Sequence, residues 1–95
     1  MKLVVVEAVF PPAEREAAVA LLRDRADAVR AMDGCERYAV HRSVDDGGGV
    51  AIVQRWTSTE AFDAYRASDA FAALGRDLKP MMSVPPSTTV ADVDG

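Results

Sequence analysis

Apolar side chains recur with two different periods in the first third of the chain. Residues Lys2 to Phe10 are rich in valine and are followed by a proline pair, which predicts a strand. Both faces of this strand are mostly apolar, which indicates that both are covered. Residues Ala13 to Met32 carry apolar side chains at helical intervals, and Gly34 suits the left-handed end of a helix. A strand followed by a long helix is therefore predicted.

The middle of the chain predicts a hairpin followed by a helix. Residues Cys35 to Val44 and Val50 to Trp56 read as strands, and Asp45 to Gly49 joins them with residue types that accept positive φ. Thr57 and Glu60 have the spacing of a capping box, so a helix is expected to start there.

The last third predicts a broken helix and a short strand. Ser68 offers a second N-cap, Pro80 ends the helical pattern, and residues Ser87 to Val93 read as a weak strand. The element order is then β-α-β-β-α-β. This order predicts an α+β fold, the ferredoxin-like plait, with a four-stranded antiparallel sheet and both helices on one face.

One face of that sheet would be left bare by the helices. We expect the bare face to carry the apolar side of the first strand, and the face with Glu7 to look toward the helices. The residues expected on the bare face are Val4, Val6, Ala8 and Phe10. An exposed face this apolar indicates an interface, so we expect two sheets to pack face to face in a homodimer.

Composition limits the classes of partner. The 95 residues predict a single domain, 1–95, with a net charge of −4 and scattered arginines, which argues against nucleic acid. Cys35 is the only cysteine, so neither an intrachain disulfide nor a cysteine-based zinc site is expected. There is no apolar run of membrane-spanning length, and the first ten residues do not read as a signal peptide. We expect a cytoplasmic protein with no membrane partner.

Four short stretches resemble the antibiotic biosynthesis monooxygenase (ABM) family. They are DGCERY at 33–38, QRWTSTEAFDAY at 54–65, SDAF at 68–71 and LKP at 78–80, and with the element order they cover nearly the whole chain. The resemblance implies a dimeric α+β barrel in which each subunit has an apolar cavity between helices and sheet. In the oxygenases of the family, aromatic polyphenols, anthrones or quinols react there with dioxygen without metal or flavin.

The same family includes heme-degrading members, which this chain resembles less well. Their proximal histidine would fall close to Gly75, and their asparagine near the start of the chain would fall at Glu7. Tyr65 falls where many members have a histidine. We therefore expect no heme, and no metal or other cofactor.

Three residues are candidates for catalysis. Glu7 lies mid-strand among apolar neighbours, and a carboxylate in an apolar cavity can act as a general base. His41, the only histidine, is the reserve base, and Trp56 matches the family tryptophan that lines the cavity. The structural alternatives are that Glu7 pairs with a cation or reaches the rim of the cavity, that His41 lies on the surface or at the dimer contact, and that Trp56 is core.

Five further residues are candidates for substrate binding. Gln54 shares a strand face with Trp56, and the aromatic candidates could position a ring. A guanidinium in the last helix could stabilise a substrate oxyanion, although arginines on helices are more often solvated. The candidates are Gln54, Tyr38, Phe62, Tyr65 and Arg76.

These observations predict a cofactor-independent monooxygenase that oxidises a polycyclic phenol, anthrone or hydroquinone with dioxygen. The deprotonated substrate would supply the electrons, and the protein would supply a base, an apolar cavity and a hydrogen bond to the oxyanion. Two alternatives are a non-catalytic barrel that binds a small ligand, and a polyketide cyclase or isomerase.

Overall fold

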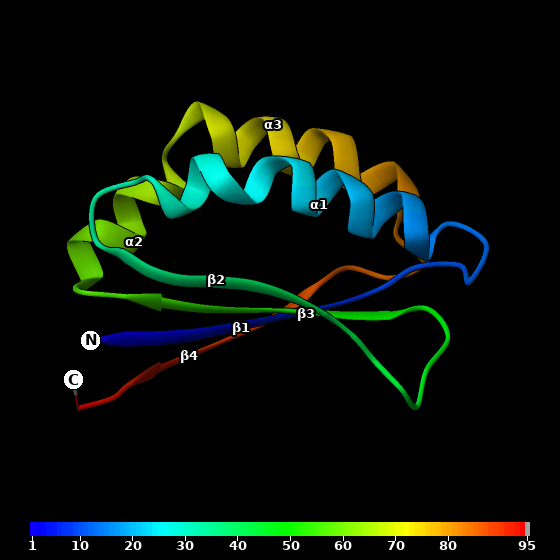
Figure 1. Ribbon diagram of the computed structural model, residues 1–95, viewed down its shortest axis with the longest axis horizontal. Coiled ribbons are helices and arrows are strands. Elements are labelled where there is room, and N and C mark those ends of the chain that lie inside the picture. The colour runs from blue at the N-terminus through cyan, green and yellow to red at the C-terminus, as the bar shows by residue number, and fades with distance from the viewer. Residues whose placement is uncertain (95) are drawn as a thin grey trace.

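The computed structural model describes residues 1–94, and its elements follow the predicted order (Figure 1). Two helical segments and a short 3-10 turn occupy the second helical position. The elements are β1 Lys2–Val9, α1 Arg15–Arg30, β2 Cys35–Arg42, β3 Gly49–Trp56, α2 Thr59–Arg66, α3 Asp69–Leu78, η1 Lys79–Met81 and β4 Ser87–Asp92. The predicted ferredoxin-like plait is confirmed.

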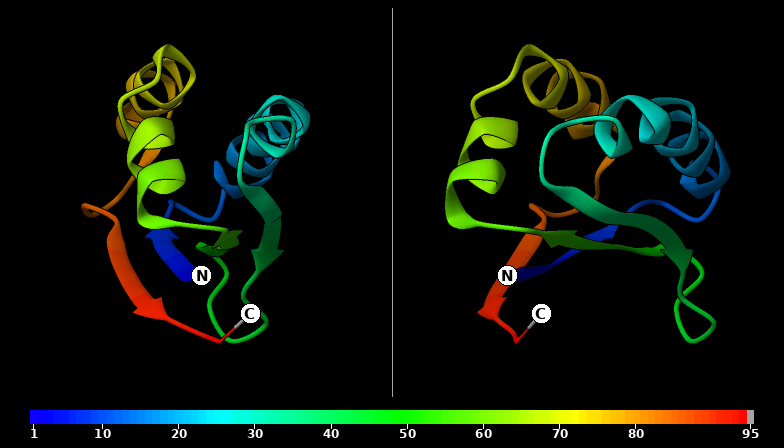
Figure 2. Two further views of the ribbon diagram at one scale, coloured as in Figure 1. Left: turned by 90° about the vertical axis from the view of Figure 1, so that its left-hand side faces the viewer. Right: turned by 60° about the vertical axis from the view of Figure 1, so that its left-hand side comes forward.

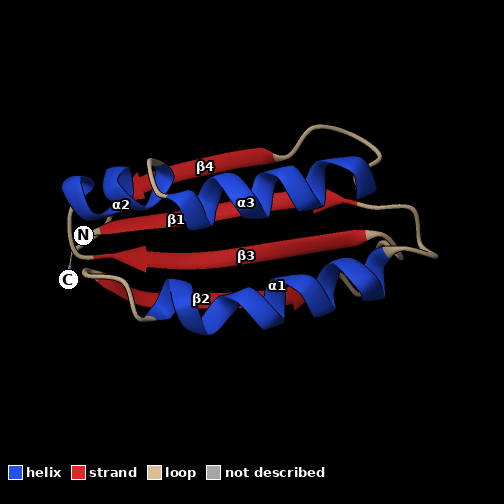
Figure 3. Ribbon diagram, turned by 90° about the horizontal axis from the view of Figure 1, so that it is seen from above, coloured by secondary structure: helices blue, strands red, loops and turns tan. Residues whose placement is uncertain are grey.

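The four strands form one antiparallel sheet in the order β2-β3-β1-β4. Figure 2 shows the helices on one side of this sheet and the other side bare. Seen from above, α1 runs over β2 and α3 runs over β1 (Figure 3). None of the helices in residues 1–94 has the length and hydropathy that a membrane span requires.

The predicted orientation of β1 is wrong. Val4, Ala8 and Phe10 are buried beneath the helices, whereas Glu7 is exposed on the opposite face. Both faces of β1 are apolar enough to be covered, so hydrophobicity alone did not distinguish them. A single charged side chain in the strand interior is most stable facing water, and this decides the orientation.

Serine side chains start both helices of the second helical region. The Ser58 hydroxyl accepts a hydrogen bond from the Ala61 backbone N–H at 3.1 Å, and Ser68 accepts one from Phe71 at 3.2 Å. The predicted break at Ser68 is confirmed. The expected capping box at Thr57 is wrong by one residue, because Ser58 is the N-cap of α2.

Gly34 is required where α1 turns into β2, as its sequence position predicts. Its φ is 82°, a left-handed conformation that favours glycine. A Cβ at this position would clash with the Cβ of Ala61 and would lie 2.8 Å from the Thr57 hydroxyl oxygen. Gly34 therefore lets this turn pack directly against the start of α2.

We predict that Gly34→Ala lowers the free energy of unfolding by about 1–3 kcal/mol, from backbone strain and the clash together. Gly47→Ala is the matched control, because a Cβ there meets only Pro12, at 3.9 Å. Urea titrations monitored by circular dichroism measure both. Equal stabilities for the two variants would contradict this account of the turn.

Candidate functional site

A cavity of about 290 Å³ lies between α3 and the inner face of the sheet. Its volume is close to the lower end of the range for small-molecule sites, which is about 300–1,000 Å³. Most of its lining is apolar, and aliphatic side chains of β3 and β1 form the floor. The floor residues are Val6, Ala8, Val50 and Ile52.

Two polar side chains meet at one end of this cavity. Tyr38 on β2 and Gln54 on β3 are directly opposite each other in the strand register, on the inner face of the sheet. Both line the cavity, although only 2% of Tyr38 and 3% of Gln54 is exposed. The sequence placed these two residues at the substrate, and the structure brings them together at the cavity.

Trp56 fixes the orientation of the Gln54 amide. The indole Nε1–H donates a hydrogen bond of 2.9 Å to Gln54 Oε1, and both groups are buried. Because the oxygen of the amide faces Trp56, its NH₂ group is left available to donate. No hydrogen bond from this NH₂ group is present among residues 1–94. Gln54 is therefore a pre-oriented donor at the cavity.

Trp56 itself does not line the cavity, contrary to expectation. It is completely buried, and its ring stacks on Tyr65 with 5.0 Å between centroids and 21° between planes. Phe62 packs against the same indole with 6.2 Å between centroids. Tyr65 does reach the cavity, whereas Phe62 does not. Trp56 and Phe62 thus belong to the hydrophobic core, where the indole contacts Gln54 and Tyr65 and holds them in place.

The hydroxyl of Tyr38 is buried without a hydrogen-bond partner among the described residues. Burial, followed by the neighbouring Tyr65, raises the pKa of Tyr38 far above its usual value. Burial also raises the pKa of Tyr65. Both phenols are therefore neutral at physiological pH. The Tyr38 hydroxyl is enclosed beside the Tyr65 phenol, so it donates to a ligand only when the side chains around it rearrange.

Arg76 lies at the mouth of the cavity, where its side chain is 73% exposed. Its Nε is 3.0 Å from Asp77 Oδ1, and Arg25 lies 2.5 Å from the other oxygen of the same carboxylate. Arg76 and then Arg25 lower the pKa of Asp77. Lys79 adds a second cation to the rim. The mouth therefore carries more positive than negative charge.

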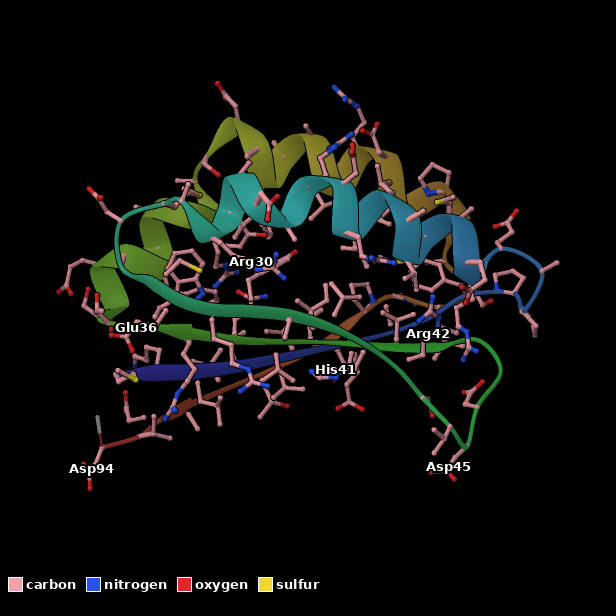
Figure 4. The ribbon with its side chains drawn as sticks, in the orientation of Figure 1. Arg30, Glu36, His41, Arg42, Asp45 and Asp94 are labelled. Atoms are coloured by element: carbon pink, nitrogen blue, oxygen red, sulfur yellow. The ribbon has the colours of Figure 1, made fainter. Side chains whose placement is uncertain are left out.

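Glu7 and His41 lie on the wrong side of the sheet to serve this cavity. Both are exposed, and Figure 4 shows His41 beneath the sheet, away from the helices. They flank Ala51 in the strand register and share a shallow hollow on the outer face. The expected placement of Glu7 in the helix-facing cavity is wrong, because the strand presents its other face there.

The interior of the cavity contains no carboxylate or imidazole among its lining residues. Within residues 1–94, no three histidine, cysteine, aspartate or glutamate side chains gather closely enough to hold a metal ion. The chemistry that the lining supports is donation of hydrogen bonds to an oxygen of a flat apolar ligand.

Most of the lining positions, including Gly75, Ala72 and Thr88, were not identified as site residues from the sequence. Gly75 and Ala72 of α3 face the cavity, and Thr88 of β4 lies at its far side. Small residues in an amphipathic helix give no local signal of a ligand site. Thr88 is in a strand whose apolar pattern is weak. Which face of the sheet its side chain occupies is determined by the pairing of β4 with β1.

Comparison with known proteins identifies the family. Residues 1–76 match the model of the family described as "Antibiotic biosynthesis monooxygenase". A Mycobacterium tuberculosis protein named "Putative monooxygenase Rv0793" is 32% identical over 79 residues, which are 83% of this chain and 77% of that protein. Its solved structure superposes with a TM-score of 0.88, covering 99% of this chain and 96% of the other. A structure from Caulobacter crescentus gives 0.93 at 25% identity, covering 99% and 90%.

We predict that folding stability falls above about pH 10, where an unfolded tyrosine ionises. The folded state holds the Tyr38 proton more tightly, so the unfolded chain loses its proton first and unfolding becomes more favourable as pH rises. The slope for one such group is up to about 1.4 kcal/mol per pH unit.

Urea titrations at several values between about pH 9 and 11.5 test this, with Tyr38→Phe as the comparison. The Phe variant should lose less stability over this range than the wild type. Parallel curves for the two proteins would show that the Tyr38 phenol ionises normally in the folded state.

Proposed function

The chain belongs to the antibiotic biosynthesis monooxygenase family, and on that premise we propose that it is a cofactor-independent monooxygenase. The family and its relatives support a monooxygenase-like function. The proposed substrate is a polycyclic phenol, anthrone or hydroquinone. The observation that carries this proposal is the pair of buried donors, Tyr38 and Gln54, at one end of an otherwise apolar cavity.

The donors act on the ionisation of the substrate. When a phenol or anthrone loses a proton, charge develops on one oxygen. The Gln54 NH₂ group and, once the side chains around it rearrange, the Tyr38 hydroxyl can both donate to that oxygen, in a cavity where little water competes. Arg76 at the mouth adds a longer-range attraction for the anion. Together these contacts lower the pKa of the bound substrate.

The bound anion then reacts with dioxygen. For an anthrone, one electron passes from the carbanion to dioxygen, and the two radicals combine to a peroxide at the ring carbon. Loss of water from that peroxide leaves a carbonyl, so that R₂CH₂ and O₂ give R₂C=O and H₂O. The substrate is oxidised and dioxygen is reduced, without an external reductant.

Neither Glu7 nor His41, the bases expected from the sequence, can remove the substrate proton in this cavity. Glu7 and His41 face away from the cavity, and the lining offers no replacement among the described residues. We propose that water at the cavity mouth accepts the proton, and that the acidity of the bound substrate makes this sufficient. The protein then contributes mainly orientation and anion stabilisation.

We predict that Tyr38→Phe and Gln54→Leu each reduce turnover by about 10–10³-fold, because each removes a donor to the developing oxyanion. Glu7→Gln is the matched control and should retain turnover. Dioxygen uptake with anthrone and with menadiol (reduced 2-methyl-1,4-naphthoquinone) measures all four proteins. A large loss in Glu7→Gln with normal Tyr38→Phe would contradict the proposed roles.

The same assay distinguishes the alternatives. A polyketide cyclase or isomerase would change its substrate without consuming dioxygen. A non-catalytic binding protein would bind aromatic ligands and leave them unchanged. Catalysed uptake of one dioxygen per substrate, with water as the coproduct, is expected only for the monooxygenase.

We also propose a homodimer that forms through the outer face of the sheet. In the single chain this face carries an uncovered row of apolar side chains, in which Ala39, Val53 and Val5 pair across three strands. The Nε atom of Arg55, on the same face, is buried without a hydrogen-bond partner among residues 1–94. Glu7 at the other end of the face gives a second copy a carboxylate to offer such an arginine.

We predict that Val5→Asp dissociates or unfolds the protein, because it buries an unpaired charge in the proposed interface. Light scattering should give twice the chain mass of 10.2 kDa for the wild type. Val44→Asp is the control, because Val44 is 98% exposed in the β2–β3 loop, and it should remain dimeric. A monomeric wild type would remove the dimer proposal.

A further inference from the structure

Gly75 is an unusual residue for its position in α3. It is the seventh of the ten residues of a helix that runs from Asp69 to Leu78. Glycine in a helix interior is less favourable than alanine, because it loses more backbone freedom on folding. Its backbone conformation is helical, so no left-handed turn requires glycine here. No neighbouring atom comes close enough to exclude a Cβ at this position either.

The space beside Gly75 is empty. A Cβ at this position would have no heavy atom within 4 Å, in contrast to Gly34 and Gly48, where a Cβ would clash. That space belongs to the cavity, since Gly75 is one of its lining residues. Ala72, one turn earlier, lines it as well. The wall that α3 presents to the cavity also carries Phe71, Leu74 and Leu78, and Gly75 leaves a recess among these side chains.

The opposite wall of the cavity is a row of side chains on the sheet. Ile52, Val6 and Thr88 are paired partners across β3, β1 and β4, and all three line the cavity. Three adjacent strands span about 10 Å. Between α3 and this row of the sheet lies a slot that is wide across the strands, and no side chain projects into it from position 75.

From this geometry we infer that Gly75 is a specificity-determining residue, which keeps the slot open for a planar ligand of three fused rings. A side chain at position 75 would fill the space that the outer ring occupies, and would leave room only for smaller ligands. This inference rests on the proposed function for the chemistry of the ligand, but not for the size of the slot. Its test is therefore a binding measurement that involves no turnover.

Three phenolic probes of increasing size test the slot. They are phenol, 1-naphthol and 1,5-dihydroxyanthraquinone, and the last is already at the quinone oxidation level. Titrations are followed under nitrogen through the emission of Trp56, the single tryptophan, which lies against Gln54 and Tyr65. The proteins are the wild type, Gly75→Ala, Gly75→Leu and the control Ala70→Leu. Ala70 is exposed on the same helix and does not line the cavity.

Gly75→Leu is expected to weaken binding of the three-ring probe by at least about tenfold, the usual effect of extra carbons in a filled pocket. Phenol should bind it within about threefold of the wild type, and Ala70→Leu should bind every probe normally. Gly75→Ala should show a smaller loss confined to the three-ring probe. It should also raise Tm by about 3–8 °C, because alanine favours the helix.

The inference is overturned if both Gly75 variants bind the three-ring probe as the wild type does, or if a folded Gly75→Leu loses phenol equally. A wild type that binds none of the probes would overturn it too. A wild type that binds the three-ring probe but consumes no dioxygen with anthrone would leave the slot intact and remove only the monooxygenase proposal.

Discussion

The hydrogen bond from the Trp56 indole to the Gln54 side chain is the constraint on which the site depends. Burying a tryptophan N–H and a primary amide is costly unless each polar atom finds a partner. The Trp56 Nε1–H donates to Gln54 Oε1 at 2.9 Å, so each residue satisfies one polar group of the other. Both side chains lie on the same face of β3. Stacking of Tyr65 on the indole then ties α2 to the strand end. One local contact thereby fixes the direction of the amide, the position of a second phenol and the angle at which α2 leaves the sheet.

The fold followed from the sequence because local signals and element order agreed. Ser68 and Gly34 acted as their residue types predict, as a helix N-cap and a left-handed turn. The facing direction of β1 did not follow, because its alternation is apolar on both sides. The exposed Glu7 contains the information that was needed, since a lone charge in a strand most often marks the solvent face. Placing it inside gave it a catalytic role that the structure does not support.

The candidate site could be predicted in part. Tyr38, Gln54, Tyr65 and Arg76 do line one cavity. That Tyr38 and Gln54 are opposite each other follows only from the register between β2 and β3, which the sequence did not predict. Trp56 was assigned to the cavity because it matches the family tryptophan and shares a strand face with Gln54, and Phe62 because an aromatic side chain could position a ring. Which aromatic ring reaches the cavity depends on how α2 packs against β3. The sequence marked Gly75 only as a position close to which heme-degrading members of the family have a histidine. Its effect on the cavity consists of space between elements that are distant in the chain.

The absence of a carboxylate from the lining is consistent with the proposed chemistry. A negative side chain inside an apolar cavity would repel a substrate anion and would raise the pKa of the substrate that it was meant to deprotonate. Neutral donors have the opposite effect, since Tyr38 and Gln54 interact more strongly with the anion than with the neutral phenol. The phenol of Tyr38 performs this task only while it keeps its proton, and burial keeps it protonated. The same desolvation that makes an internal base costly therefore makes an internal donor effective. A net charge of −4 is compatible with anion binding, because the positive groups that lie near the site are at its mouth.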